Sequence, residues 1–237
     1  MIIVDWNIKT DPLKIWNYRR DIFKKVLQSE KPDIFCAQEA YKHQVDFLVE
    51  LNPGYRYIGK GRNAGDDRGE HCPILYNTTT MELRDNGQFW LSKTPNIPST
   101  YWEWIPRICT WGKFKEKNSG KEFYHFNTHM PLPYNFYGKH KAFGVLESEL
   151  KKFTGLPKVL TGDFNSHAGS WLWKRIHAMG FQKNPHTKAT HMPICKIPLL
   201  CFDAIFTTPD FSILEYRLLK HPKASDHFGV LAEVVFK

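Results

Sequence analysis

The sequence has no closely spaced pair of cysteines. Five cysteines, an odd number, are scattered over 237 residues, at Cys36, Cys72, Cys109, Cys195 and Cys201. Small secreted domains that depend on disulfides carry even numbers of cysteines at short spacings. A disulfide framework is therefore not expected, and the pattern predicts a reducing compartment and a cytoplasmic protein.

The sequence also lacks export and membrane signals. No apolar run approaches the roughly 20 residues that a transmembrane helix needs. The first residues, Met1-Ile2-Ile3-Val4, lead directly into an expected core strand, without the basic and long apolar regions of a signal peptide. No internal repeat or low-complexity segment stands out. We expect one domain over residues 1–237, with no transmembrane segment and no obligate protein partner.

Acidic residues are in deficit. The chain has 33 Lys and Arg against 24 Asp and Glu, which gives a formal net charge of +9. This surplus favours a polyanionic partner, such as a nucleic acid, a phosphorylated metabolite or an anionic lipid surface. A solvated basic surface explains it equally well, so charge alone leaves the partner open.

Apolar runs and turn residues predict alternating strands and helices. The opening strand–helix–strand–helix order predicts an α/β fold, a sheet covered by helices. A first helix is expected to begin at Asp11-Pro12 and to end at Lys31-Pro32. Residues 89–106, rich in tryptophan, proline and serine, should form a long ordered loop. Further helices are expected at residues 44–51, 139–153 and 171–179, and strands at 2–8, 33–39, 55–58, 73–76, 107–114, 122–127, 158–163, 202–206, 214–219 and 230–236.

The stretch Gly162-Asp163-Phe164-Asn165 follows a short apolar run that is typical of a buried strand. If Asp163 and Asn165 remain extended, their side chains point to the same side. The carboxylate can accept a proton from water or bind a hard cation, and the amide can hold that water or a phosphate oxygen. Gly-Asp also begins ordinary turns, so the stretch becomes informative only beside similar groups at other strand ends.

Six predicted strand ends carry oxygen or imidazole groups. A buried polar group costs free energy unless it is paired, so such a cluster needs a shared purpose. Its carboxylates and asparagines suit a hard divalent cation such as Mg²⁺. The groups are Asn7, Glu39, Asn127 with His129, Asp163 with Asn165, Asp203, and Asp226 with His227.

In this order the groups resemble the motifs of the endonuclease/exonuclease/phosphatase superfamily, which includes pancreatic deoxyribonuclease. One such motif is weak, but six in order, in a match from residue 6 to residue 236, are specific. The middle of the chain resembles the branch with deadenylase-like and uncharacterised bacterial members. The six motifs are Trp6-Asn7, Gln38-Glu39, Asn127-Thr128-His129, Gly162-Asp163-Phe164-Asn165, Asp203 before Ile205-Phe206, and Ser225-Asp226-His227.

The resemblance implies a four-layered α/β sandwich, with two mainly antiparallel sheets face to face and helices on the outside. It implies a divalent-metal-dependent phosphodiesterase, a nuclease, that hydrolyses nucleic acid by direct attack of water on phosphorus. Mg²⁺ is the expected cofactor, with Mn²⁺ able to replace it. The alternatives are a phosphatase or phosphodiesterase acting on inositol phosphates or phospholipid headgroups and, in another class, a catalytically silent binding protein.

The resemblance also implies where the metal and the attacking water lie. Glu39 would bind the metal, and Asn7 and Asp226 would complete or order its shell, with Asn7 also near the substrate. Asp163 would orient or deprotonate the water, and Asn165 would hold that water or the phosphate.

Three further groups would act on the phosphate and the leaving group. His227 would contact the phosphoryl group, held in its tautomer by Asp203. His129 would face the leaving oxygen, oriented by Glu70. Arg107 would contact the phosphate, although Glu70 and Arg107 could instead form a surface ion pair.

One position departs from the pattern of many relatives. Those relatives carry an acidic residue two positions after the first asparagine, where this chain has Lys9. The loss of a carboxylate favours one well-formed cation site over two.

Two groups of residues stay open. Trp102 and Trp104 can stack on bases or pack the long loop onto the sheet. We favour substrate contact for these two and packing for Trp90 and Trp111. Histidines and cysteines late in the chain match no closed zinc-finger spacing, so we interpret them as loop residues at the border of the cleft. They are His186, His191, Cys195 and Cys201.

Overall fold

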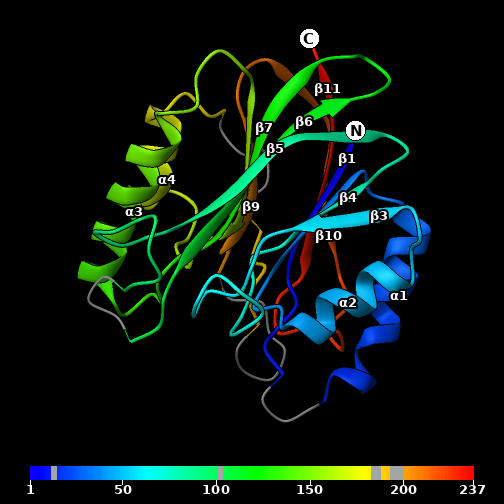
Figure 1. Cartoon of the computed structure of the whole chain (residues 1–237), viewed down its shortest axis with the longest axis horizontal. Coiled ribbons are helices and arrows are strands. Elements are labelled where there is room, and N and C mark those ends of the chain that lie inside the picture. Colours follow the sequence, from blue (N-terminus) through cyan, green and yellow to red (C-terminus); the bar gives the residue numbers. More distant parts are fainter. Residues whose placement is uncertain (12–14, 101–103, 183–187, 193–199) are drawn as a thin grey trace.

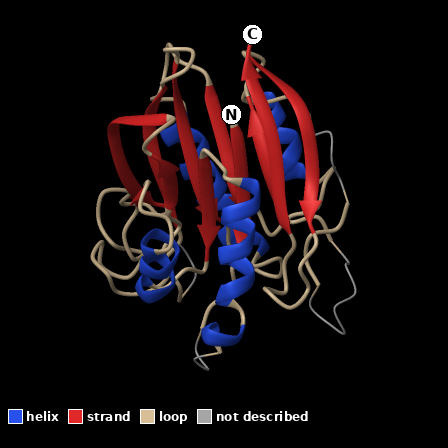
Figure 2. Cartoon of the chain, turned by 90° about the vertical axis from the view of Figure 1, so that its right-hand side faces the viewer, coloured by secondary structure: helices blue, strands red, loops and turns tan. Residues whose placement is uncertain are grey.

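A computed structural model describes residues 1–11, 15–100, 104–182, 188–192 and 200–237. Two sheets lie face to face, and helices cover the outer side of each (Figures 1 and 2). The predicted four-layered α/β sandwich is therefore confirmed. The elements are β1 (Ile2–Asn7), a 3₁₀ turn (Trp16–Tyr18), α1 (Arg20–Glu30), β2 (Ile34–Gln38), α2 (Lys42–Glu50), β3 (Tyr55–Ile58), β4 (Ile74–Asn77), β5 (Met81–Trp90), β6 (Ile108–Glu116), β7 (Glu122–His129), α3 (Phe136–Leu150), β8 (Lys158–Asp163), α4 (Trp171–Ala178), β9 (Asp203–Thr207), β10 (Phe211–Leu219) and β11 (Gly229–Phe236).

Each sheet is antiparallel except for one central pair. The six-stranded sheet has the order β10-β11-β1-β2-β4-β3, and the five-stranded sheet has the order β5-β6-β7-β8-β9. The parallel pairs are β1–β2 and β7–β8. Because parallel strands end at the same edge of a sheet, each pair has its carboxyl ends together, and bonds from Asn7 to Asp163 and from Gln38 to Asn127 place the two edges side by side. The antiparallel strands β9 and β11 begin there.

Side chains alternate between outer layers against the helices and an inner layer between the sheets. In β1, Trp6 packs in the core that includes α1 and α2, whereas Ile3 belongs to the inner core. The same alternation places Asp5 and Asn7 on the inner side. There Asn7 reaches Asp163 of the opposite sheet. A second outer core lies between the five-stranded sheet and the helices α3 and α4.

The inner layer becomes polar toward the edge where the parallel strands end. Its inward positions there carry fully buried polar side chains: Asp5, Gln38, His125, Asn127 and Thr161. Gln38 Nε2 donates to Asp5 Oδ1 and to Asn127 Oδ1, each at 2.7 Å. Buried polar groups need partners, so these bonds tie the two sheets together behind that edge.

Two expectations about local structure were wrong. The first α-helix begins at Arg20 rather than at Asp11-Pro12, and the Asp11 carboxylate accepts from the backbone N–H of Trp16, the first residue of the 3₁₀ turn. Strand β5 was missed. It lies at a sheet edge, has a bulge between Leu83 and Asp85, and exposes polar residues that have low strand propensity. None of the described helices is long and apolar enough to cross a membrane.

Candidate active site

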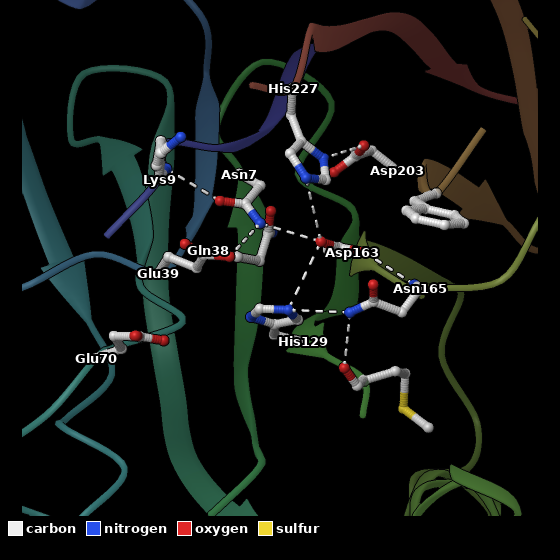
Figure 3. A network of polar contacts seen from close by, with 12 residues as sticks. Asn7, Lys9, Gln38, Glu39, Glu70, His129, Asp163, Asn165, Asp203 and His227 are labelled. Atoms are coloured by element: carbon white, nitrogen blue, oxygen red, sulfur yellow. Dashed lines mark hydrogen bonds and ion pairs between the residues drawn. The ribbon is translucent and has the colours of Figure 1, made fainter. Parts of the chain in front are cut away.

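Asp163 lies at the centre of the polar cluster (Figure 3). It ends β8 with 1% of its surface exposed. Its Oδ2 accepts from Asn7 Nδ2 at 3.0 Å, and the same Nδ2 donates to Glu39 Oε1 at 2.9 Å. The glycine before it is required by packing, since a Cβ on Gly162 would lie 2.1 Å from the carbonyl oxygen of Thr128.

Asn165 reaches the cluster for a different reason than the sequence indicated. Its φ is +48°, so the chain turns after Asp163 and does not remain extended. The turn lets the Asn165 N–H donate to Asp163 Oδ1 at 2.8 Å. The amide Nδ2 then lies 3.2 Å from His129 Nε2. Lys139, a buried lysine in the first turns of α3, donates to the Asn165 carbonyl at 2.5 Å and fixes this loop.

His227 and Asp203 form a buried pair, which is the contact that the resemblance implied. His227 Nδ1 lies 2.8 Å from Asp203 Oδ2, and His227 Nε2 lies 3.8 Å from Asp163 Oδ2. Burial alone would lower the pKa of His227. The negative charges of Asp203 and Asp163 outweigh it and raise that pKa to about 10. The imidazole is thus protonated at neutral pH and can donate from Nε2.

His129 has the opposite character. Burial, and then the positive charge of Arg107 and Arg62, holds the pKa of His129 well below its usual range. Its contact of 3.6 Å with Asp163 is therefore not an ion pair. Because Asn165 Nδ2 points at His129 Nε2, the network assigns the proton to Nδ1.

Glu70 does not orient His129. Its carboxylate pairs with Arg62 Nη1 at 2.6 Å, and it lies apart from His129 in Figure 3. Neither half of that pair is a free surface group, since both side chains are largely buried. Together with Arg107, Glu39 and His129 they line a small pocket beside the cluster. The expected role of Glu70 is therefore corrected, and Arg62 is a residue that the sequence did not single out.

The proposed metal ligands are linked to one another through Asn7 and Lys9. Glu39 and Asp226 offer carboxylate oxygens, and Asn7 offers an amide oxygen, which is the donor set that suits a hard divalent cation. Lys9 Nζ lies 2.8 Å from Asp226 Oδ2, and the Lys9 N–H donates to Asn7 Oδ1. The residues fit one cation at Glu39, whereas at Asp226 a cation would have to compete with the ammonium of Lys9.

A second set of ligand atoms is tighter. Asp163, Asp203 and His227 have ligand atoms within 4.8 Å of one another, and they form the only such group among the described residues. Within this trio, His227 Nδ1 lies 2.8 Å from Asp203 Oδ2, and His227 Nε2 lies 3.8 Å from Asp163 Oδ2. The trio is therefore a second donor set for a cation, distinct from the oxygen donors at Glu39.

The tryptophans and the late histidines and cysteines are only partly described. Trp104 is fully exposed, and Trp90 is buried with its Nε1–H donated to Arg62 O. Trp111 packs on Phe153. Packing is thus confirmed for Trp90 and Trp111, whereas Trp102, His186 and Cys195 lie outside the described residues. Cys201 is buried, and His191 lies beside His227.

Comparison with known proteins agrees with this geometry. Residues 6–227 match the model of the Endonuclease/Exonuclease/phosphatase family. The chain is 30% identical over 161 residues to an uncharacterized protein of Acanthamoeba polyphaga mimivirus, a match that spans 64% of this chain and 59% of that protein.

Two solved structures match this chain over its whole length. A family protein from Bacteroides thetaiotaomicron is 30% identical, with a TM-score of 0.87, over 100% of this chain and 95% of that one. A mannosyl-6-phosphatase of the same species is 29% identical, with a TM-score of 0.85, over 100% of both chains.

Proposed function

Because the chain belongs to the endonuclease/exonuclease/phosphatase family, we propose that it is a divalent-metal-dependent phosphohydrolase in which water attacks phosphorus directly. The observation that carries this proposal is the meeting of Asp163 and Asn165, at the end of β8, with His227, just before β11, in one buried cluster. A catalytically silent binding protein is disfavoured, because the carboxylates, amides and imidazoles of the six motifs are all present.

Asp163 is the group that prepares the water. Burial, and then the charge of Asp203, raises the pKa of Asp163, whereas His227 and the Asn7 amide lower it. A carboxylate with a raised pKa is a better proton acceptor than a free one. Asn7 and the Asn165 N–H occupy the two Asp163 oxygens from either side, so its orientation is fixed before substrate binds.

The two histidines differ in their own charge and in the oxygen that each would contact. His227, held as an imidazolium by Asp203, donates from Nε2 to an oxygen of the phosphoryl group and offsets the negative charge that grows there. His129 is neutral, and its Nδ1–H is available to the leaving oxygen. A bound divalent cation supplies further neutralisation of the phosphate charge, and Glu39 is the residue that would hold it.

A small phosphorylated sugar is the substrate class that the comparisons favour. The mannosyl-6-phosphatase is 29% identical over the full length of both chains, and it acts on a phosphomonoester. The second candidate is the phosphodiester of a nucleic acid. It is favoured by the net charge of +9 and by the fully exposed Trp104 in the long loop.

One panel of substrates separates these candidates. The protein with Mg²⁺ is assayed on sugar 6-phosphates, inositol phosphates, and single- and double-stranded DNA and RNA. Release of phosphate from a sugar phosphate without cleavage of polymer supports the phosphatase. Polymer cleavage, together with a binding affinity that falls steeply with salt as counterions are released, supports the nuclease. Absence of hydrolysis across the whole panel would overturn both.

The combined effect of substitutions at Asp163 and His227 provides a second test. Asp163→Asn and His227→Ala should each reduce turnover strongly and leave substrate binding nearly unchanged. Because both residues act on one transition state, the double variant should be far less than additively worse. Additive losses would show that the two residues act at separate steps.

A further inference from the structure

His191 is a half-buried histidine that the six motifs do not include. It belongs to the short segment 190–192, which lies against the catalytic residues in space although it is distant from most of them in sequence. Its backbone forms isolated bridges to Leu200 on one side and to His227 on the other.

Hydrogen bonds join the segment to the residues at the start of β9 and to those just before β11. Thr190 Oγ1 accepts from the backbone N–H of Asp203 at 3.2 Å, and the carbonyl of Thr190 accepts from Phe228 at 2.8 Å. The N–H of Met192 donates to the carbonyl of Asp226 at 2.7 Å. These bonds fix the backbone of His191 relative to both Asp203 and Asp226.

The ring of His191 is equally well placed. It stacks on Phe202 with centroids 5.0 Å apart and an interplanar angle of 23°. Its other neighbour is the ring of His227, with centroids 4.6 Å apart. These two aromatic contacts hold the plane of the ring beside His227.

The nitrogens of this ring have no hydrogen-bond partner among the described residues, and they are not buried away from solvent. The charges that act on the ring are those of His227, Asp163, Asp226 and Glu39, which are the groups of the catalytic cluster. An imidazole held beside the catalytic cluster, with nitrogens that reach solvent and bond no described residue, can bind a ligand there. In either protonation state it offers at least one N–H donor.

We propose that His191 is a substrate-binding residue, and that it donates a hydrogen bond to the phosphoryl group beside His227. This inference rests on the proposed phosphohydrolase function and extends it to a residue outside the family motifs. The alternative is that the ring only packs on Phe202 and supports His227. Both hypotheses predict that loss of the whole ring weakens phosphate binding, so the test needs a variant that keeps an aromatic ring.

His191→Phe separates the two readings. Phenylalanine preserves the stacking on Phe202 and His227 but removes both ring nitrogens. The matched control is His140→Phe, because His140 packs on Trp171 at 5.1 Å on the outer face of α3. The probe is inorganic phosphate with Mg²⁺, measured by calorimetry and as a competitive inhibitor of p-nitrophenyl phosphate hydrolysis.

We expect His191→Phe to bind phosphate about tenfold more weakly or worse, as for loss of a hydrogen bond to a charged group. His140→Phe should bind like the wild type. Wild-type affinity in His191→Phe, with an unchanged melting temperature, would overturn the inference. If that variant does not fold, His191→Leu is tested in the same way. Failure of the proposed function would give a different result from failure of this inference, because the wild type itself would then hydrolyse no phosphate ester.

Discussion

His125 should make the free energy of unfolding decrease as the pH falls from 7 to 5. A substitution of His125 should remove this contribution. It lies in the polar inner layer between the sheets and is fully buried, with its Nε2 3.2 Å from Cys36 Sγ and 3.2 Å from Thr161 Oγ1. No carboxylate offsets its burial, which lowers the pKa of His125 from 6.5 to about 3.

The sign follows from proton linkage. Below pH 6.5 the unfolded chain binds a proton at this histidine and the folded chain does not, so acidification favours unfolding. The stability is therefore fully present above the unfolded pKa and is lost as the pH falls toward the folded pKa. Between pH 7 and pH 5 the loss at one such group is about 2 kcal/mol. That figure holds for any folded pKa well below 5.

The assay is urea unfolding of the wild type and of His125→Gln at pH 7, 6 and 5. The variant can be less stable at pH 7, because glutamine fits the site differently. Its stability should nevertheless fall by about 2 kcal/mol less between pH 7 and pH 5 than that of the wild type. Parallel pH profiles for the two proteins would refute a neutral buried His125.

Two further predictions concern the cation. Glu39→Gln should weaken Mg²⁺ binding and reduce turnover with the fold intact. The reason is that Glu39, unlike Asp226, forms no ion pair with Lys9. Unchanged Mg²⁺ affinity by calorimetry would show that Glu39 is not the principal ligand. Lys9→Met should instead tighten Mg²⁺ binding, because it removes the ammonium that lies 2.8 Å from Asp226 Oδ2. Weaker binding in Lys9→Met would mean that the ammonium supports the cation site rather than competes with it.

The strand ends and their polar residues could be predicted because they depend on local pattern. Apolar runs followed by Asn7, Glu39 and Asp163 identify buried strands whose last residues are polar, and β1, β2 and β8 have those ends. The order of the motifs then predicted the sandwich. Strand β5 was missed because it lies at the edge of its sheet and exposes polar residues. Its composition is therefore that of a loop rather than of a buried strand.

Side-chain partners were harder to predict, because they depend on contacts between distant segments. Glu70 and Arg62 are close in sequence, yet only the folded loop shows that Arg62 rather than His129 receives the Glu70 carboxylate. Asn165 was predicted at the right place for the wrong reason, since a positive φ is not visible in the sequence. Lys139 gave no signal at all, because a lysine in a helix is ordinarily exposed.

The turnover of Asp163→Asn tests the central claim most directly. Asparagine keeps the shape of the side chain and an oxygen for the Asn165 N–H, but it cannot accept a proton from water. With Mg²⁺, and on whichever phosphate ester the wild type hydrolyses, the rate should fall by about 10²–10⁴-fold or more. Melting temperature and substrate affinity should change little. A variant that folds, binds substrate and turns over at the wild-type rate would contradict the account.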